Sequence, residues 1–215
     1  MLKINYKKFT KHAEKVAKTA GDARPVLKGI NHDDKGTVTV TDAHRLYQAY
    51  NVNAPTNAVL DAVTGEEIDA GNYPDVSRII PLKDDASHVV TIDDIKAIIK
   101  LTKAMQQAGI YDGSTTRKDV NLRIEVIDGR CEIGLVTPES SAVSFYKTFH
   151  DVKEYRNGDF TMQVNAQYFI EALEMLADMG AQSADIRLYG KLRPFTIVPV
   201  ESSDILALIC PVRAY

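Results

Sequence analysis

Lysine side chains recur at helical spacing in two separate stretches of this sequence. In a predicted helix at residues 93–107, Lys96, Lys100 and Lys103 share one face, beside an apolar face. A second predicted helix, residues 7–20, gathers its lysines opposite its apolar side: Lys7, Lys8, Lys11, Lys15 and Lys18. Neighbouring ammonium groups repel one another unless an anion lies alongside. Each face is therefore either a binding surface for an anionic partner or a solvated, solubilising helix face.

A third predicted helix breaks this pattern. It runs from residue 165 to 179, with Asn165 expected as its N-cap and Gly180 as its end. Its polar face is acidic and carries Gln167, Glu171, Glu174 and Asp178. If all three helices faced the same phosphate backbone, this helix would repel it.

The side chains that usually carry catalysis show no matching arrangement. Asp42 and His44 are two residues apart in a predicted strand, so they would share a face and could form an acid–base pair. No nucleophile or phosphate-binding loop accompanies them. The five histidines are scattered, and Cys131 and Cys210 lack metal-ligand spacing. The sequence therefore predicts a protein that is not an enzyme and uses no cofactor and no metal.

Composition bounds the class of protein. The 215 residues are 45% hydrophobic and 26% charged, which is ordinary for a globular protein of one or two domains. The formal net charge is −3, so a nucleic-acid surface would have to come from segregated rather than excess positive charge. The N-terminus lacks the apolar run of a signal peptide, and no stretch approaches the roughly 18 consecutive apolar residues of a membrane span. We expect a cytoplasmic protein that does not enter a membrane.

The elements that must position the lysine faces follow one order three times. The first round is a strand at 1–6, the helix at 7–20 and strands at 25–32, 37–41 and 45–52. The second is a strand at 87–92, the helix at 93–107 ended by Gly109, and strands at 121–127, 132–136 and 142–150. The third is a strand at 159–164, the acidic helix and strands at 186–189, 195–200 and 205–211. Three β-α-β-β-β units predict an α+β fold of antiparallel sheets with helices on one face.

Two further segments lie between the first and second units. A strand at 59–63 is expected to pair with Ile68 across the turn TGEE. Residues 71–81 then run as an extended connector that contains Pro74 and Pro81.

Three short stretches resemble one family. They are TDAHRL at residues 41–46, YPDVSRIIP at 73–81 and ALICPVRAY at 207–215. In this order they resemble motifs of the bacterial DNA sliding clamp, the beta subunit of DNA polymerase III. RPVLKGI at 24–30 and NAQYFIEALEML at 165–176 are similar to further segments of that family. Each motif alone is weak, but their combination within a β-α-β-β-β repeat is specific.

The resemblance implies a DNA-clamp-like fold of about one and a half clamp domains, as in a shortened or phage-like member. Residues 1–72 resemble a single unit, the first half of the clamp's middle domain, and residues 73–215 resemble its whole last domain of two units. The first domain and the second half of the middle domain have no counterpart. Because the family's dimer contact joins its first domain to its last, ring closure in this chain is in doubt.

The family's pocket for short peptides of replication proteins lies between its middle and last domains. The positions carried over are Leu27, Thr41, His44, Arg45, Leu46, Pro74, Arg78, Ile79, Leu208, Cys210, Pro211, Val212 and Arg213. An apolar hollow rimmed by cations suits a peptide with hydrophobic anchors and an acidic or amide group. Ala43 replaces a usual glycine and Cys210 a usual methionine, which puts the shape of the pocket in doubt. The alternative is that residues 211–213 simply end an edge strand.

The resemblance also implies encirclement of double-stranded DNA. Lysines on inward-facing helices would attract phosphates without reading bases, so the protein could slide. The candidates are Lys8, Lys11, Lys15, Lys18, Arg24, Lys96, Lys100 and Lys103. An odd number of alternating units per chain favours a homo-oligomer with two-fold contacts, and four chains would supply the twelve units of a clamp ring.

Three functions follow as hypotheses. The first is a reduced sliding clamp, of the kind a phage or mobile element would carry, that tethers a replicative polymerase to DNA and meets its polymerase or clamp loader through a linear peptide motif. The second is a clamp-like adaptor or decoy that binds clamp-interacting peptides without encircling DNA, which the acidic third helix and the missing units favour. The third is a lysine-faced DNA-binding protein unrelated to clamps, for which residues 211–213 would be dispensable.

Overall fold

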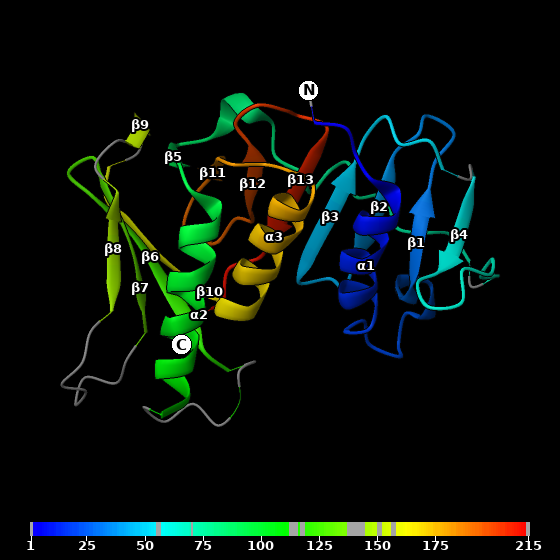
Figure 1. Cartoon of the computed structure of the whole chain (residues 1–215), viewed down its shortest axis with the longest axis horizontal. Coiled ribbons are helices and arrows are strands. Elements are labelled where there is room, and N and C mark those ends of the chain that lie inside the picture. The colour runs from blue at the N-terminus through cyan, green and yellow to red at the C-terminus, as the bar shows by residue number, and fades with distance from the viewer. Residues whose placement is uncertain are drawn as a thin grey trace.

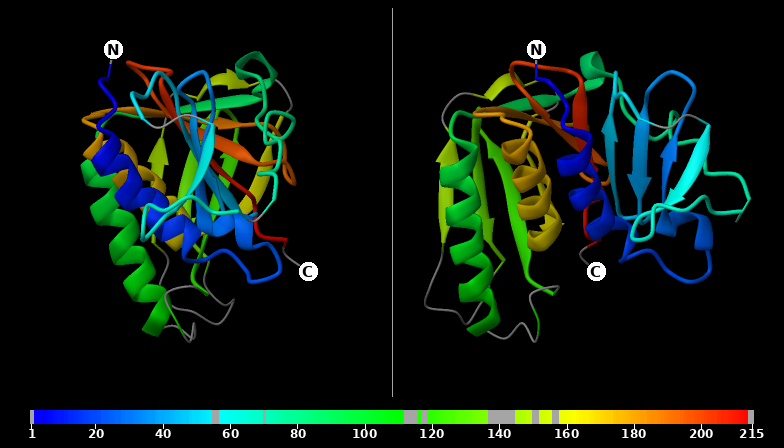
Figure 2. Two further views of the ribbon diagram at one scale, coloured as in Figure 1. Left: turned by 90° about the vertical axis from the view of Figure 1, so that its right-hand side faces the viewer. Right: turned by 45° about the vertical axis from the view of Figure 1, so that its right-hand side comes forward.

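Three helices lie side by side across one face of the molecule, with the β-strands behind and beside them (Figure 1). The computed structural model describes residues 2–54, 57–69, 71–111, 116, 119–136, 145–149, 152–155 and 158–213. The helices are α1 (Tyr6–Ala17), α2 (Ile95–Tyr111) and α3 (Ala166–Asp178). The acidic helix α3 lies between the two lysine-bearing helices, and the turned views keep all three on the same side (Figures 1 and 2). We call α1, α3 and α2 together the helix layer.

Among the described residues, nine strands form the larger sheet, in the order β4-β1-β2-β3-β13-β12-β11-β5-β9, and all neighbours are antiparallel. Their bounds are β1 Gly29–His32, β2 Val38–Thr41, β3 Arg45–Ala49, β4 Ala58–Asp61, β5 His88–Ile92, β9 Val152–Tyr155, β11 Ala184–Leu188, β12 Phe195–Pro199 and β13 Ile205–Ile209. The smaller sheet has the order β10-β6-β7-β8. It consists of β6 Asn121–Ile127, β7 Arg130–Leu135, β8 Tyr146–Phe149 and β10 Phe160–Asn165. One apolar core runs from α1 through both sheets.

The second and third units exchange their first strands. Strand β5 precedes α2 but pairs with β11 of the third unit, and β10 precedes α3 but pairs with β6 of the second unit. In the first unit, the place beside β1 is taken by β4, which follows β3 in the chain. The hairpin after β4 forms as expected, since Ile68 N donates to Val59 O at 2.8 Å. Strand β4 therefore pairs with β1 at the position where, in the second and third units, a strand of the other unit pairs.

The predicted strand at residues 1–6 is wrong for the residues that are described. Residues 2–5 are not part of a strand, and Tyr6 already begins α1. Asn5 caps this helix, because its side-chain oxygen accepts a hydrogen bond from Lys8 N at 3.0 Å. A strand in this position would need the edge of a second half-domain, as β5 and β10 have, and the described residues offer no such edge.

Helix α2 also departs from its prediction. It continues through Gly109 to Tyr111, so Gly109 does not end it. A Cβ atom at Gly109 would lie 2.8 Å from Val120 Cγ1 and 3.1 Å from Leu135 Cδ1. Glycine is therefore needed here for close packing against the small sheet, and not for a left-handed stop. By contrast, Asn165 caps α3 and Gly180 follows it with φ +99°, as expected.

The predicted strand at residues 25–32 begins only at Gly29. Residues 25–28 form a 3₁₀-helix before β1, because Pro25 has no N–H for a strand ladder and Leu27 N donates to Arg24 O at 3.0 Å. The predicted strand 142–150 contains β8, while residues 142–144 and 150 lie outside the described residues.

Candidate functional site

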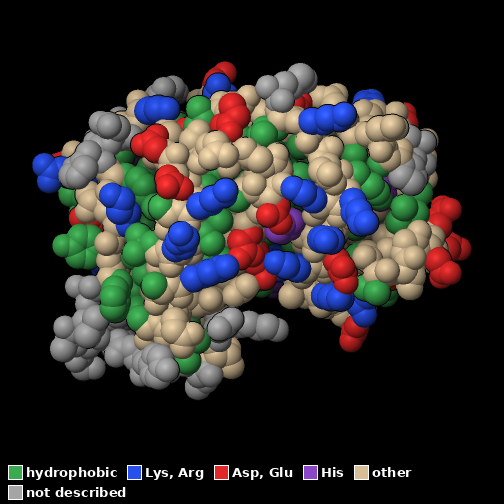
Figure 3. Space-filling view, in the orientation of Figure 1, with side chains coloured by type: hydrophobic (Ala, Val, Ile, Leu, Met, Phe, Trp, Pro, Cys, Tyr) green, Lys and Arg blue, Asp and Glu red, His purple; other side chains and the backbone are tan. Residues whose placement is uncertain are grey.

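The helix layer presents cations over much of one face of the molecule (Figure 3). All eight predicted DNA-binding side chains are exposed: Lys8, Lys11, Lys15, Lys18, Arg24, Lys96, Lys100 and Lys103. Seven of them come from α1, its C-cap and α2, and Arg24 lies between α1 and the 3₁₀-helix. Acidic side chains lie among them in the same view (Figure 3). The lysine faces predicted from spacing therefore meet on one surface.

The acidic row of α3 is paired with its two neighbours. Glu174 bridges both lysine helices, since its Oε1 lies 2.6 Å from Lys103 Nζ and its Oε2 lies 3.4 Å from Lys15 Nζ. Asp178 Oδ2 lies 2.8 Å from His12 Nε2, and its carbonyl oxygen accepts a hydrogen bond from Lys8 Nζ at 3.0 Å. Glu174 therefore acts as a counter-ion inside the layer, a role that the sequence reasoning missed.

The surroundings of Glu174 keep its carboxylate charged. Partial burial would raise the pKa of Glu174, but the hydrogen bonds and charges of Lys103 and Lys15 outweigh it, so the pKa lies below its ordinary value. Lys18 pairs with Glu14 one turn earlier, at 2.5 Å. Within the described ranges, Lys11, Arg24, Lys96 and Lys100 make no ion pair. Their ammonium and guanidinium groups are open to an external anion.

Arg45 lies in a buried ionic network behind α3. Its side chain is 2% exposed, its Nε donates to Asp42 Oδ2 at 3.1 Å, and its Nη1 donates to Glu171 Oε2. The guanidinium carbon also lies 4.4 Å from the ring centroid of Tyr168. Because side chains alternate along β3, Arg45 points toward the helices and Leu46 toward the outer face. Arg45, expected beside a peptide, is instead held on the opposite side of the sheet.

The TDAHRL segment contains the tight turn between β2 and β3: Thr41 ends β2, residues 42–44 form the turn, and Arg45 begins β3. Asp42 Oδ1 accepts the backbone N–H groups of His44 and Arg45, each at 2.9 Å, and Asp42 Oδ2 accepts the hydroxyl of Thr19 at 2.6 Å. Ala43 takes φ +72° in this turn. Asp42 and His44 therefore do not share a strand face, and the acid–base pair considered from their spacing is not formed.

The outer face of the sheet carries an apolar cluster where the first and third units join. Leu46 of β3 and Leu208 of β13 are direct antiparallel partners. With Val198 and Leu206 they form the joint cluster, covered in part by Tyr50, Val76, Ile80 and Cys210. The connector, residues 71–81, thus packs against side chains of β13, the strand that precedes the C-terminal segment. This brings the predicted residues Leu46, Leu208 and Cys210 together.

Leu27 belongs to a neighbouring cluster. It packs with Ala20 and Val26, against the partly buried Tyr73 and Val59. Thr41 lies beside it, since its backbone N–H donates to the Tyr73 hydroxyl oxygen at 3.0 Å. Burial raises the pKa of Tyr73, so this tyrosine stays neutral. Tyr73, which begins the connector motif, was not among the predicted site residues.

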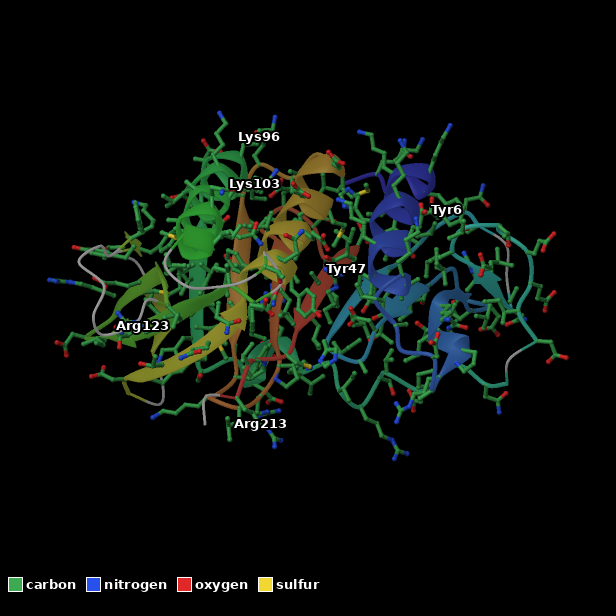
Figure 4. The ribbon with its side chains drawn as sticks, turned by 90° about the horizontal axis from the view of Figure 1, so that it is seen from below. Tyr6, Tyr47, Lys96, Lys103, Arg123 and Arg213 are labelled. Atoms are coloured by element: carbon green, nitrogen blue, oxygen red, sulfur yellow. The ribbon has the colours of Figure 1, made fainter. Side chains whose placement is uncertain are left out.

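The remaining predicted pocket residues lie at the surface around these clusters. His44, Pro74, Arg78, Ile79 and Arg213 are exposed, and Cys210, Pro211 and Val212 are half-buried. The backbone fixes the C-terminal segment, because Cys210 N donates to His44 O at 2.9 Å and Val212 N to Gln163 O at 2.8 Å. Arg213 lies on the side of the molecule away from Lys96 and Lys103 (Figure 4). The two predicted surfaces therefore face opposite ways.

A groove of about 720 Å³ lies along the connector on the same outer face. Tyr73, Val76 and Ile80 line one side of it, and Thr39 and Gln48 of the first unit line the other. No sequence motif indicated this groove, because it forms only where the connector crosses the sheet. The described residues contain no group of three potential metal ligands, and no helix among them is long and apolar enough to cross a bilayer.

The chain is similar to beta sliding clamps, although no family model matches it. It is 26% identical over 240 residues to the beta sliding clamp of Streptococcus pneumoniae serotype 4, covering 92% of this chain and 60% of that protein. For the clamp of Staphylococcus epidermidis the identity is 23% over 241 residues, with 93% and 60% covered. This chain therefore spans 60% of the length of these relatives.

Solved clamp structures share the fold. The DNA polymerase sliding clamp of Bacillus subtilis superposes with a TM-score of 0.73 at 18% identity, covering 96% of this chain and 62% of that one. The beta chain of DNA polymerase III from Streptococcus pneumoniae gives 0.72 at 20% identity, covering 98% and 64%. The predicted clamp-like α+β fold and the predicted resemblance to the bacterial sliding clamp family are confirmed.

Proposed function

We propose that this chain is a reduced sliding clamp, a non-catalytic processivity factor that holds a replication enzyme near double-stranded DNA. The observation that carries the proposal is the separation of charge on a clamp-like fold: a protein of net charge −3 collects exposed cations on its helix layer. The relatives that it resembles are beta sliding clamps, and the solved ones are DNA polymerase clamps.

The helix layer is the proposed DNA surface. Lysine ammonium groups attract phosphate oxygens regardless of base sequence, so the contact would be non-specific and would weaken as salt rises. Lys11, Lys96 and Lys100 are the strongest candidates, because they are exposed and make no ion pair with another described residue. Such contacts are easily exchanged from one phosphate to the next, which suits movement along a duplex.

Charge reversal tests the DNA surface. Lys11→Glu combined with Lys100→Glu should abolish binding to a fluorescent duplex at low salt, as measured by anisotropy. Lys35→Glu is the matched control, because Lys35 is exposed in the β1–β2 turn and outside the helix layer. Equal loss in both proteins, or no loss in either, would contradict the proposed surface. Retention on closed circular DNA that is lost when the circle is cut would further indicate encirclement.

The outer face is the proposed peptide surface. The joint cluster and the neighbouring Ile79, Pro211 and Val212 offer apolar area, while Arg78 and Arg213 offer cations at its rim. A short peptide with hydrophobic anchors and an acidic or amide group, such as a polymerase or clamp loader carries, fits this chemistry. Ile79→Glu should weaken such a peptide at least tenfold in a titration, whereas Leu192→Glu, at an exposed position in the β11–β12 turn, should not.

Self-association would complete the proposed assembly. The last strand of the first unit, β3, pairs with the last strand of the third unit, β13. The third strand after α2, β8, has β7 as its one neighbour among the described strands. We therefore propose that β8 meets a second copy across a two-fold axis, within a homo-oligomer of up to four chains. A stable monomer at micromolar concentration in light scattering would exclude this assembly.

A clamp-like adaptor that binds peptides without encircling DNA is the second candidate. One observation favours it, the acidic row within the helix layer. The adaptor predicts that Lys11→Glu with Lys100→Glu leaves peptide affinity unchanged while the wild type gives no processivity on a primed template. Processive synthesis that disappears with the charge reversal would exclude it.

A further inference from the structure

Glu174 forms ion pairs with both helices that flank α3 in the helix layer. It is the described carboxylate that pairs with lysines of both flanking helices, one oxygen with Lys103 of α2 and the other with Lys15 of α1. The side chains of Lys103 and Lys15 are 53% and 46% exposed, while that of Glu174 is 25% exposed. An external anion can therefore reach both ammonium groups, but it arrives where a carboxylate already lies.

The other acids around the layer are engaged differently. Glu171 is 13% exposed and is held by the buried Arg45, so it faces the sheet and not the surface lysines. Asp178 faces His12 at the end of α3, and Glu14 pairs with Lys18 within the same helix. Removing one of these charges would release at most one surface lysine. Removing the charge of Glu174 would release two, one from each side of the layer.

The paired and unpaired lysines should differ in what they contribute to DNA binding. Lys11, Lys96 and Lys100 are accompanied by mobile salt ions, and phosphate binding would release these ions to solution. Lys15 and Lys103 hold a carboxylate that is tethered to the protein, so a phosphate must displace it and then remain near its negative charge. The free-energy gain from these two lysines is correspondingly small.

We infer that Glu174 is an internal competitor for DNA phosphate that sets the affinity of the helix layer for duplex DNA. This inference rests on the proposed function and deepens it. By occupying Lys15 and Lys103, Glu174 holds the contact weaker than the number of cations would give. A weak backbone contact suits a protein that must move along DNA while it remains attached. The acidic row thereby becomes part of the DNA surface and not an obstacle beside it.

The test is Glu174→Gln, which keeps the size of the side chain and removes its charge. Binding to a fluorescent duplex is measured by anisotropy over a series of salt concentrations. We expect about three- to tenfold tighter binding at a fixed salt concentration. The slope of log affinity against log salt should steepen by up to about 1.8, because each newly engaged lysine adds about 0.9.

Glu66→Gln is the matched control, since Glu66 is exposed in the hairpin after β4 and lies outside the helix layer. Equal tightening in both variants would mean that only net charge matters, and would overturn the inference. An unchanged or weaker affinity of Glu174→Gln at equal folded fraction, measured by circular dichroism, would overturn it as well.

A double-mutant cycle keeps the inference separate from the proposed function. Lys103→Gln should weaken DNA binding less than twofold in the wild type, and about three- to tenfold in the Glu174→Gln background. Equal effects in the two backgrounds would reject the competitor role of Glu174 while DNA binding stands. If the wild type does not bind DNA and Lys11→Glu with Lys100→Glu changes nothing, the proposed DNA surface fails and the inference fails with it.

Discussion

The buried network of Arg45 gives a prediction whose size follows from the structure. Glu171→Gln removes one of the two carboxylates that neutralise this guanidinium, in a site where Arg45 is 2% and Asp42 0% exposed at the side chain. Breaking a buried ion pair commonly costs about 3–5 kcal/mol because one charge is left unpaired. Asp42 remains here, and the Lys15 carbonyl oxygen lies 3.4 Å from Arg45 Nη2, so we expect about 2–3 kcal/mol.

Urea unfolding at pH 7 measures this loss as a lower midpoint with an unchanged slope. Glu125→Gln is the control, because Glu125 belongs to a surface pair with Arg123 at 3.6 Å and should cost less than about 0.5 kcal/mol. A loss below about 1 kcal/mol for Glu171→Gln would refute the account of Arg45 as a buried, doubly paired charge. Arg45 variants that lose peptide binding must therefore be compared with their loss of stability before a pocket role is assigned.

Four further predictions concern the backbone and pH. Ala43→Gly should raise the free energy of unfolding by about 0.5–1 kcal/mol, since Ala43 has φ +72°; an unchanged urea midpoint would contradict this. Gly109→Ala should lower the free energy of unfolding by about 1–3 kcal/mol, because the new methyl group would lie 2.8 Å from Val120 Cγ1, just before β6. Gly29→Ala would place a Cβ 2.5 Å from a methyl carbon of the β4 hairpin, so hydrogen exchange in β4 should accelerate, whereas Gly21→Ala, with open space around it, should leave β4 protected. The pKa of Glu174 is lowered in the folded protein, so its ion pairs stabilise the fold above the unfolded-state pKa of about 4.3 and lose this effect as pH falls through the folded-state pKa. The urea midpoints of the wild type and Glu174→Gln, measured over a series of pH values, should therefore converge as pH falls.

Periodicity located most of the elements because their polar and apolar faces are cleanly separated. The α3 helix begins after Asn165 and ends before Gly180, where cap chemistry is local and can be read from the sequence. Gly109 was misread because a glycine within a helix serves either as a stop or as a close-packing position. The choice depends on Val120, just before β6, and Leu135 of β7, which approach Gly109 only in the folded protein.

The exposure of the helix lysines was predictable from the sequence, but their charge balance was not. Helical spacing identified Lys15 and Lys103 as surface cations, but it could not show that α3 would lie between their helices. Strand alternation could have shown that Arg45 and Leu46 face opposite ways, since they are adjacent in β3. The motif resemblance placed both in one pocket, and the geometry separates the buried cation from the outward leucine.

The order of strands explains how half a domain remains folded without its other half. In the second and third units, the first strand after each helix pairs with a strand from the other unit. β6 pairs with β10, and β11 pairs with β5. In the first unit the equivalent position is closed by β4, so the edge of β1 is covered and its backbone groups are paired. The lysines of α1 need only this sheet behind them, because α1 packs on β1 and β2 and contacts α3 at its side. A half-domain closed by β4 can therefore carry its share of the basic face on its own sheet.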